Sequence, residues 1–222
     1  MKKWSLAIED ISLSILYENY LSRIDDISTL YSVVLYADMK IRGADFIKEN
    51  EEVFLSSNFP EGFTTIKNGI DMDACSHSGN LERINAYQTV ISLVSNYENL
   101  IDSLIKHFDI CDRAVKMAKP TSDTNTIDSP ILKKSQALHD ALNFSSSSIG
   151  SHELDYFYKI IRIRNRLVHN QGIVKESDLP LLKDWVKGRR IELEKNHIDD
   201  FIHFFLMPIR SMFICLSEVL AR

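Results

Sequence analysis

The stretch YKIIRIRNRLVHNQGIV, residues 158–174, is the most informative part of this sequence. Apolar residues recur at helical spacing in and just before it, and they predict one buried stripe made of Tyr156, Ile160, Ile163 and Leu167. At about 100° per residue, the polar residues of this helix fall together on the other side: Arg162, Asn165, Arg166 and His169. Gly172 follows this polar face and is expected to stop the helix as a C-cap residue. This helix therefore has one side for a core and an opposite side with cationic hydrogen-bonding groups. That combination indicates more than a structural role.

Helical periodicity extends over most of the chain, and we expect an all-α bundle of long antiparallel helices. Apolar residues at three- and four-residue steps predict long helices over 4–41, 79–118 and 198–220, with Pro208 inside the last. Shorter helices are expected over 44–56, 129–144 and 177–187, and a short extended arm near 189–194. Ser129 is the expected N-cap of its helix, because Pro130 suits the first helical position. We treat residues 1–222 as a single domain. Residues 1–78 are expected to form the N-terminal helices and an irregular connection, and residues 79–222 the helical bundle that contains the stretch 158–174.

The composition excludes a generally basic nucleic-acid-binding surface. The chain has 222 residues, 45% of them hydrophobic and 26% charged, and a formal net charge of -5. Any contact with RNA must therefore come from local positive charge. One such cluster lies in the motif helix: Lys159, Arg162, Arg164 and Arg166. A second cluster, Lys187, Arg189 and Arg190, is expected to be a solvated turn.

The sequence predicts no metal site, cofactor or disulfide framework. The three cysteines are far apart and form no Cys-x-x-Cys pair, and Cys111 and Cys215 lie in apolar helical patterns typical of core thiols. Asp71, Asp73, Cys75 and His77 alternate, but alternation in a loop is not a ligand geometry. Acidic residues interrupt the first apolar run, and we expect no membrane span and a cytoplasmic protein.

The run from Arg164 to His169 resembles the Arg-x(4-6)-His motif of the HEPN superfamily, in the form where Asn follows the Arg. Its extension, His169-Asn170-x-Gly172-x-Val174, is similar to HEPN proteins of bacterial toxin–antitoxin and phage-defence systems. The resemblance implies a helical bundle. Many members are metal-independent ribonucleases that form homodimers, so that two motif copies share one cleft. Others have lost activity and serve as binding modules.

The resemblance implies roles for the motif residues. Arg164, Asn165 and His169 would be catalytic. Separately, we expect Arg162, Arg166 and Asn170 to bind substrate. Histidine can transfer protons near neutral pH, and arginine can bind two phosphate oxygens of an RNA phosphodiester. The expected products are a 2′,3′-cyclic phosphate and a 5′-hydroxyl. Ideal helix geometry instead places Arg162 and Arg166 nearer the His169 face than Arg164; the family form favours Arg164.

Glu98 interrupts the apolar pattern of the helix expected over 79–118. It lies between Val94 and Ile101, where an apolar residue is expected. In one interpretation, Glu98 pairs with Arg164 and fixes its guanidinium. A buried carboxylate is costly without a partner, and the run Tyr-Glu-Asn-Leu-Ile at residues 97–101 is similar to one in related defence HEPN proteins. In the other interpretation, the apolar seam rotates, Glu98 is exposed, and Tyr97 and Leu100 carry the packing.

Two other functional classes stay open beside the ribonuclease. A catalytically silent HEPN homodimer would bind RNA, an antitoxin or a nucleotidyltransferase partner. A plain helical scaffold would use the arginines for ion pairs and His169 to cap a helix. A ferritin-like metal enzyme is disfavoured, since the sequence has no Glu-x-x-His pairs on facing helices.

Overall fold

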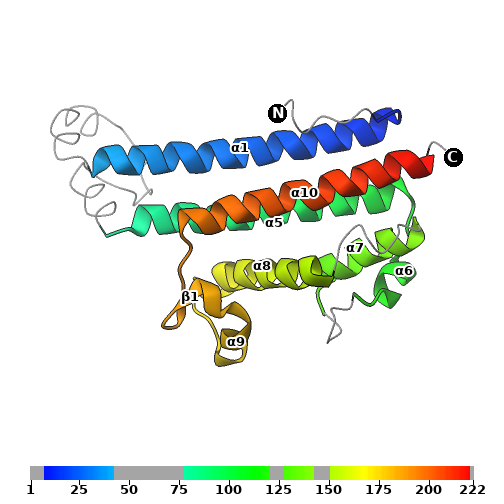
Figure 1. The fold of residues 1–222 in the computed structure, drawn as a ribbon. Helices are drawn as coiled ribbons and strands as arrows, with labels where there is room; N and C mark the ends of the chain where they lie inside the picture. The colour runs from blue at the N-terminus through cyan, green and yellow to red at the C-terminus, as the bar shows by residue number, and fades with distance from the viewer. Residues whose placement is uncertain (1–7, 43–77, 121–127, 143–150, 221–222) are drawn as a thin grey trace, which may run out of the picture.

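The fold is all-α, as predicted, and consists of long helices packed side by side (Figure 1). In the computed structural model, residues 8–42, 78–120, 128–142 and 151–220 are described. The helices are α1 (Ile11–Ile41), α5 (Asn80–His107), α6 (Asp112–Met117), α7 (Pro130–Ala141), α8 (Ser151–Asn170), α9 (Leu179–Leu182) and α10 (Lys195–Leu220). Two 3₁₀ turns flank α9, at Glu176–Asp178 and Lys183–Trp185, and two short strands follow, β1 (Val186–Lys187) and β2 (Arg190–Ile191).

Helix α5 is the centre of the bundle, because it contacts α1, α7, α8 and α10. Figure 1 shows α1 on one side of α5 and α10, with α7 and α8 on the other side. Its buried positions follow a helical period and include Val90, Leu93, Val94, Tyr97, Leu100, Ile101 and Leu104. The seam rotates so that Tyr97 and Leu100 carry packing, as the second interpretation of Glu98 expected.

Helix α1 lies along α5 and α10 through one apolar stripe. Asp10 caps its start, since its carboxylate accepts a hydrogen bond of 2.9 Å from the Leu13 amide. The buried stripe then includes Tyr17, Tyr20, Ile24 and Tyr31. The Tyr20 hydroxyl donates to the Phe205 carbonyl of α10 at 2.8 Å. Apolar burial and this bond together fix α1 against the last helix.

The helix expected over 79–118 is interrupted, which corrects the prediction of one continuous element. Helix α5 ends at His107, and Asp109 adopts a left-handed backbone with φ 50° before α6 begins. Aspartate tolerates this conformation better than most residues. Phe108 and Ile110 pack against the core at the turn. Cys111 is exposed at the start of α6, so its prediction as a core thiol was wrong, whereas Cys215 is partly buried.

The expected extended arm is a small hairpin. β1 and β2 pair antiparallel, with Val186 opposite Ile191 and Lys187 opposite Arg190. Gly188 has φ +63° and is the first residue of the two-residue turn, where a left-handed residue suits the strand twist. An isolated bridge joins Ile173 to Arg190 and ties the hairpin to the chain that leaves α8.

Helix α10 is more apolar than we expected. By length and composition, Lys195–Ser217 meets the criterion for a membrane span, with 23 residues and a mean hydropathy of 1.3. Core helices of soluble proteins meet the same criterion, and 33% of the window is buried inside the bundle. Phe201, Phe205, Ile209 and Phe213 supply that buried face. The expectations of no membrane and a cytoplasmic location therefore stay predictions.

Some predictions concern residues outside the described ranges. Two of these predictions are the helix over 44–56 and the run of alternating Asp71, Asp73, Cys75 and His77. The division of one domain at residue 78 also stays a prediction.

Phe205 offers a test of the helical core. The Phe205→Ala variant should lower the free energy of unfolding by about 3–5 kcal/mol, because it opens a cavity among buried aromatic rings. Phe205 is 1% exposed and its ring lies 5.5 Å from that of Phe157. Urea unfolding followed by circular dichroism gives the measurement. Met207→Ala is the matched control on the same helix; Met207 is 45% exposed, and a cost equal to that of Phe205→Ala would contradict the packing described.

Candidate functional site

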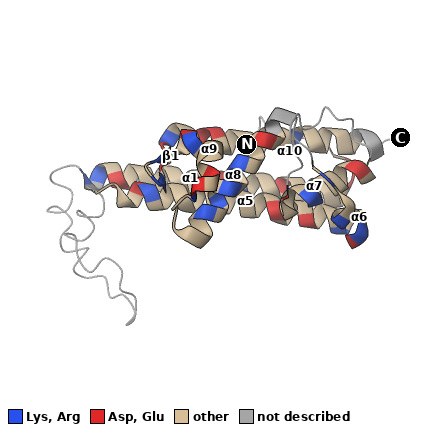
Figure 2. Cartoon of the chain, turned by 90° about the horizontal axis from the view of Figure 1, so that it is seen from below, with Lys and Arg blue, Asp and Glu red and all other residues tan. Residues whose placement is uncertain are grey.

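Helix α8 carries the predicted motif, and its buried stripe is as expected. Ile160, Ile163 and Leu167 are buried, together with Phe157 and Ile161. Tyr156 is partly buried and its ring lies 5.0 Å from that of Phe204. Blue positions mark the basic residues of α8 in Figure 2. The apolar stripe holds α8 against α5 and leaves the basic side chains at the margins of the interface.

Arg162 and Arg166 share one carboxylate, that of Asp178. Asp178 lies in the 3₁₀ turn after α8, and its side chain is 5% exposed. Arg162 donates to Oδ1, and Arg166 donates to Oδ2 through Nε at 2.5 Å. Burial acts to raise the pKa of Asp178, but the hydrogen bonds from the two guanidiniums outweigh it and hold that pKa below its usual value. Both arginines, which we expected to bind substrate, thus have a structural partner.

Asn170 belongs to the same cluster. Its Oδ1 atom accepts a hydrogen bond of 3.1 Å from Nη1 of Arg166, one helical turn earlier. The predicted substrate-binding residues therefore lie together, as expected for one helix face. Sequence reasoning missed Asp178, which joins them. The signal in the sequence was an aspartate shortly after an arginine-rich helix. Only the structure shows that the chain after α8 folds back and brings Asp178 to Arg162 and Arg166.

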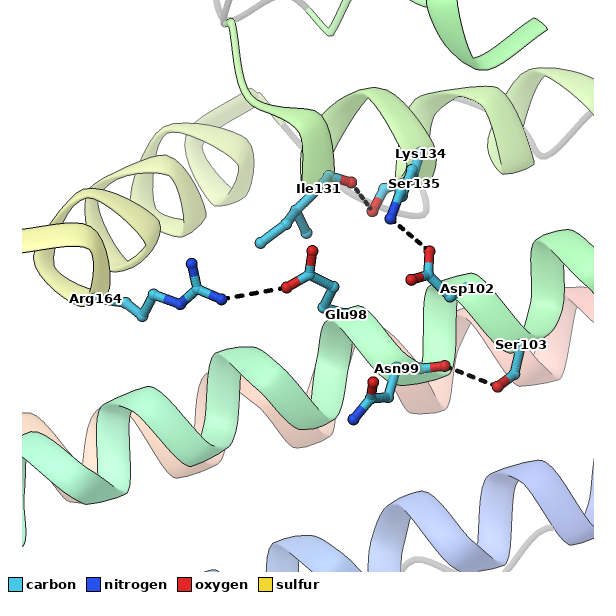
Figure 3. A network of polar contacts seen from close by, with 8 residues as sticks. All are labelled: Glu98, Asn99, Asp102, Ser103, Ile131, Lys134, Ser135 and Arg164. Carbon is cyan, nitrogen blue, oxygen red and sulfur yellow. Dashed lines mark hydrogen bonds and ion pairs between the residues drawn. The ribbon is translucent and has the colours of Figure 1, made fainter. Parts of the chain in front are cut away.

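Arg164 points to a different element from Arg162 and Arg166. Its Nη2 atom lies 3.3 Å from Oε2 of Glu98 on α5, so the predicted pairing of these residues is present (Figure 3). Nη1 of the same guanidinium donates to Oδ1 of Asn165 at 3.0 Å. The side chains of Arg164 and Glu98 are 23% and 30% exposed. Glu98 fixes the guanidinium of Arg164 in a semi-buried position.

A pocket of about 170 Å³ opens beside this pair. Helix α8 contributes Tyr158, Ile161, Arg162, Arg164 and Asn165, and α5 contributes Glu98. The start of α7 closes the pocket, through Asp128, Ser129, Pro130 and Ile131. Two of the three residues predicted to be catalytic, Arg164 and Asn165, therefore lie in one concave site with Glu98.

His169 lies apart from that pocket, at the exposed C-terminal end of α8. No hydrogen bond or ion pair of its imidazole is found within the described ranges, and none joins it to Arg164. Its neighbour Val168 is 47% exposed, and Ile173 beyond the helix is 46% exposed. The structure thus separates the two central motif residues: Arg164 is held inside, and His169 is presented to the surface.

Helix α8 ends in a left-handed turn of two residues, Gln171 and Gly172. The Gly172 amide donates to the Arg166 carbonyl at 3.0 Å, and the preceding Gln171 adopts a left-handed backbone with φ 51°. The left-handed stop therefore begins one residue before the expected Gly172. Gly172 has φ +81°, and a Cβ atom there would lie 2.7 Å from the Tyr87 hydroxyl oxygen. That hydroxyl donates to the Ile191 carbonyl at 2.5 Å, which holds α5, α8 and the hairpin together.

The chemistry available here is that of cations, amides and one imidazole. Within the described ranges, no group of three or more His, Cys, Asp or Glu side chains is placed to hold a metal ion. Guanidiniums stabilise anionic oxygen, and an exposed imidazole can exchange protons with a bound substrate. Such a set suits an anionic ligand.

Comparisons of the chain with models of protein families, with curated proteins and with solved structures gave no match.

Gly172 provides a test of the helix terminus. The Gly172→Ala variant should lower the free energy of unfolding by about 2–3 kcal/mol, since alanine is strained at this φ and its Cβ would overlap Tyr87. Gly188→Ala is the matched control, because Gly188 also has a positive φ but a Cβ atom there would meet nothing within 4 Å. Chemical denaturation gives both values. Equal costs would show that the contact with Tyr87 does not constrain the motif end.

Asp178 provides a test with a defined pH dependence. The Asp178→Asn variant should cost about 2–3 kcal/mol at pH 7, because two partly buried guanidiniums lose their carboxylate. The folded pKa of Asp178 is lowered, so its stabilisation is complete above the unfolded pKa of about 3.9 and is lost as the pH falls through the folded value. The difference in unfolding free energy between wild type and variant should therefore shrink below about pH 4. Asp184→Asn, at an exposed aspartate of the same segment, is the control and should change stability little at any pH.

Proposed function

We propose that this chain is a metal-independent endoribonuclease of HEPN type that acts as a toxin or antiphage-defence effector. One observation carries the proposal: α8 holds Arg164 and Asn165 in a pocket with Glu98, and presents His169 at the same helix's exposed end. A helix made only for packing has no need of a cation fixed beside an open pocket and an imidazole left in solvent. The type of reaction, RNA cleavage without a metal ion, comes from the resemblance of residues 164–169 to the HEPN motif.

In the proposed reaction, the 2′-hydroxyl of RNA attacks the adjacent phosphorus, and the bond from phosphorus to the 5′-oxygen breaks. The 2′-hydroxyl loses a proton and the leaving 5′-oxygen gains one, so the products are a 2′,3′-cyclic phosphate and a 5′-hydroxyl. His169 supplies one of these proton transfers. Arg164 stabilises the additional negative charge of the phosphorane, and Asn165 holds Nη1 of Arg164 in position.

The spacing on α8 favours a homodimer. Arg164 and His169 are five residues apart, which is about 7.5 Å along the helix axis and about 140° around it. The Arg164 guanidinium and the His169 imidazole of a single chain therefore do not point to the same phosphate. A second copy that packs against the exposed Val168 and Ile173 would bring its own motif end to the site. Apolar side chains at this end support self-association there.

One observation favours the alternative of a catalytically silent binding module. Arg162 and Arg166 are paired with Asp178, and Arg164 is paired with Glu98. A protein in which these three arginines all have structural partners could use the same face to hold RNA, an antitoxin or a nucleotidyltransferase partner. Cleavage chemistry separates the two functions, whereas dimerisation does not.

The test is RNA cleavage by the purified chain in EDTA, with identification of the product ends. Wild type should cleave and leave cyclic phosphates. His169→Ala should lower the rate about 10²- to 10⁴-fold, the range for loss of a proton-transfer group. Arg164→Ala should also inactivate the protein.

Two controls make the result specific. His203→Ala removes an exposed histidine of α10 and should leave cleavage unchanged. If Arg162→Ala abolishes activity and Arg164→Ala does not, the assignment of the essential arginine is wrong. A folded dimer that cleaves no tRNA, rRNA or mRNA supports the binding module instead.

A further inference from the structure

The start of α7 has an unusual N-cap. Ser129 is the N-cap residue, and serine is favoured there because its hydroxyl oxygen accepts a hydrogen bond from the first free helix amides. Here the hydroxyl makes no such bond. The residue is 3% exposed, and its Oγ atom has no hydrogen-bond partner among the described residues. A buried hydroxyl without a partner is costly, and this one lines the pocket beside Arg164.

A second polar group of the same pocket is also unsatisfied. The Nε atom of Arg164 is buried and has no partner within the described part of the chain, although both Nη atoms are bonded. Nε–H and the Ser129 hydroxyl are both able to donate a hydrogen bond. The pocket therefore has two buried donors with no acceptor assigned to them. Their common complement is a ligand rich in acceptor oxygens.

The charges around the pocket favour an anion. The Asp128 carboxylate lies 2.6 Å from Nζ of Lys133, so the charges of these two residues cancel. Of the other lining residues, Arg162 and Arg164 are cationic and Glu98 is anionic. Outside the lining, Asp178 pairs with Arg162 and also with Arg166, so three guanidiniums in this region meet two carboxylates. The N-terminus of α7, where Pro130 and Ile131 line the pocket, adds the partial positive charge of a 12-residue helix. Figure 3 shows Ile131, at this end of α7, next to the Arg164–Glu98 pair.

The size of the pocket limits what enters it. The pocket volume is about 170 Å³. Pockets for whole small ligands usually measure about 300–1,000 Å³. The space therefore suits one phosphate group of a polymer, with the rest of the chain outside.

We propose that the N-terminus of α7 is the phosphate-binding half of this pocket, and that Ser129 donates its hydroxyl hydrogen to a phosphodiester oxygen of single-stranded RNA. Arg164 binds the same phosphate from α8, and the free amides at the start of α7 face it, as in other anion sites at helix N-termini. Glu98 holds the guanidinium until the phosphate arrives. This inference rests on the proposed function, because that function supplies RNA as the ligand.

The decisive variant is Ser129→Asp. Aspartate places a carboxylate at the positive end of α7 beside Arg164, so the variant should stay folded, which its melting temperature checks. The same carboxylate occupies the anion position, and affinity for a 2′-O-methyl single-stranded oligoribonucleotide should fall about tenfold or more. If Ser129 were purely structural, the folded Ser129→Asp variant would bind the oligonucleotide as tightly as wild type does. Ser129→Ala, which removes only the hydroxyl, should weaken binding about three- to tenfold.

Fluorescence anisotropy with the labelled oligonucleotide gives the affinities, and inorganic phosphate is the competitor. Ser32→Asp is the matched control: it adds the same charge on α1, where the exposed Ser32 hydroxyl donates to the Ser28 carbonyl of the same helix, and affinity should stay near that of wild type. Phosphate should displace the oligonucleotide from wild type and far less effectively from Ser129→Asp.

The outcomes separate this inference from the proposed function. Unchanged affinity in both Ser129 variants would overturn the inference, even if cleavage still depends on His169. Binding that depends on Ser129 in a protein that never cleaves RNA would support the phosphate site and overturn the nuclease. Binding of inorganic phosphate alone, without the oligonucleotide, would overturn RNA as the ligand.

Discussion

The fold depends on the burial of Tyr97 at the centre of α5. Its ring lies 4.6 Å from that of Phe157 on α8 and 5.9 Å from that of Phe205 on α10. Its hydroxyl forms a 2.8 Å hydrogen bond with Ser135 on α7. One side chain thus joins four helices, and burial raises its pKa to about 12, so the hydroxyl stays neutral. Aromatic packing of this kind stabilises a core beyond the area it buries.

The position of Glu98 follows from that of Tyr97. Because Tyr97 turns into the core, the next residue of α5 lies at the edge of the interface with α8. There the Glu98 carboxylate reaches Arg164 while it stays partly solvated. A semi-buried pair of this kind costs less desolvation than a fully buried one. The core thus places the guanidinium, and the candidate site depends on bundle packing rather than on a loop.

The other two arginines stabilise the chain after α8. Asp178 binds both, and it sits in the turn that leads to α9 and the hairpin. Tyr87 reaches the same region from α5, where it contacts Gly172 and bonds to Ile191. The exposed end of α8 therefore has a rigid base. These contacts hold the helix end that carries His169. A fixed position suits a side chain that contacts a substrate or a second copy of the chain.

Local patterns were enough to predict much of this protein. Apolar periodicity predicted the all-α class and the buried stripe of α8, because a helix repeats every 3.6 residues whatever surrounds it. The Ser129-Pro130 pair predicted the start of α7. The break in the α5 pattern left two interpretations of Glu98 open, and the structure combines them: Tyr97 and Leu100 carry the packing, and Glu98 pairs with Arg164. The exposure of Cys111 and the interruption after His107 were not predicted, since both depend on how Phe108 and Ile110 pack at a turn.

By itself, the sequence determined which residues line each helix face, because side-chain direction within a helix follows from the backbone geometry. Only the tertiary structure decided which groups those faces meet. Asp178 is 16 residues from Arg162, Glu98 is 66 residues from Arg164, and Ser129 loses its usual capping role to line the pocket at the Arg164 guanidinium. Contacts of this kind depend on the packing of distant helices, and helical periodicity does not encode them.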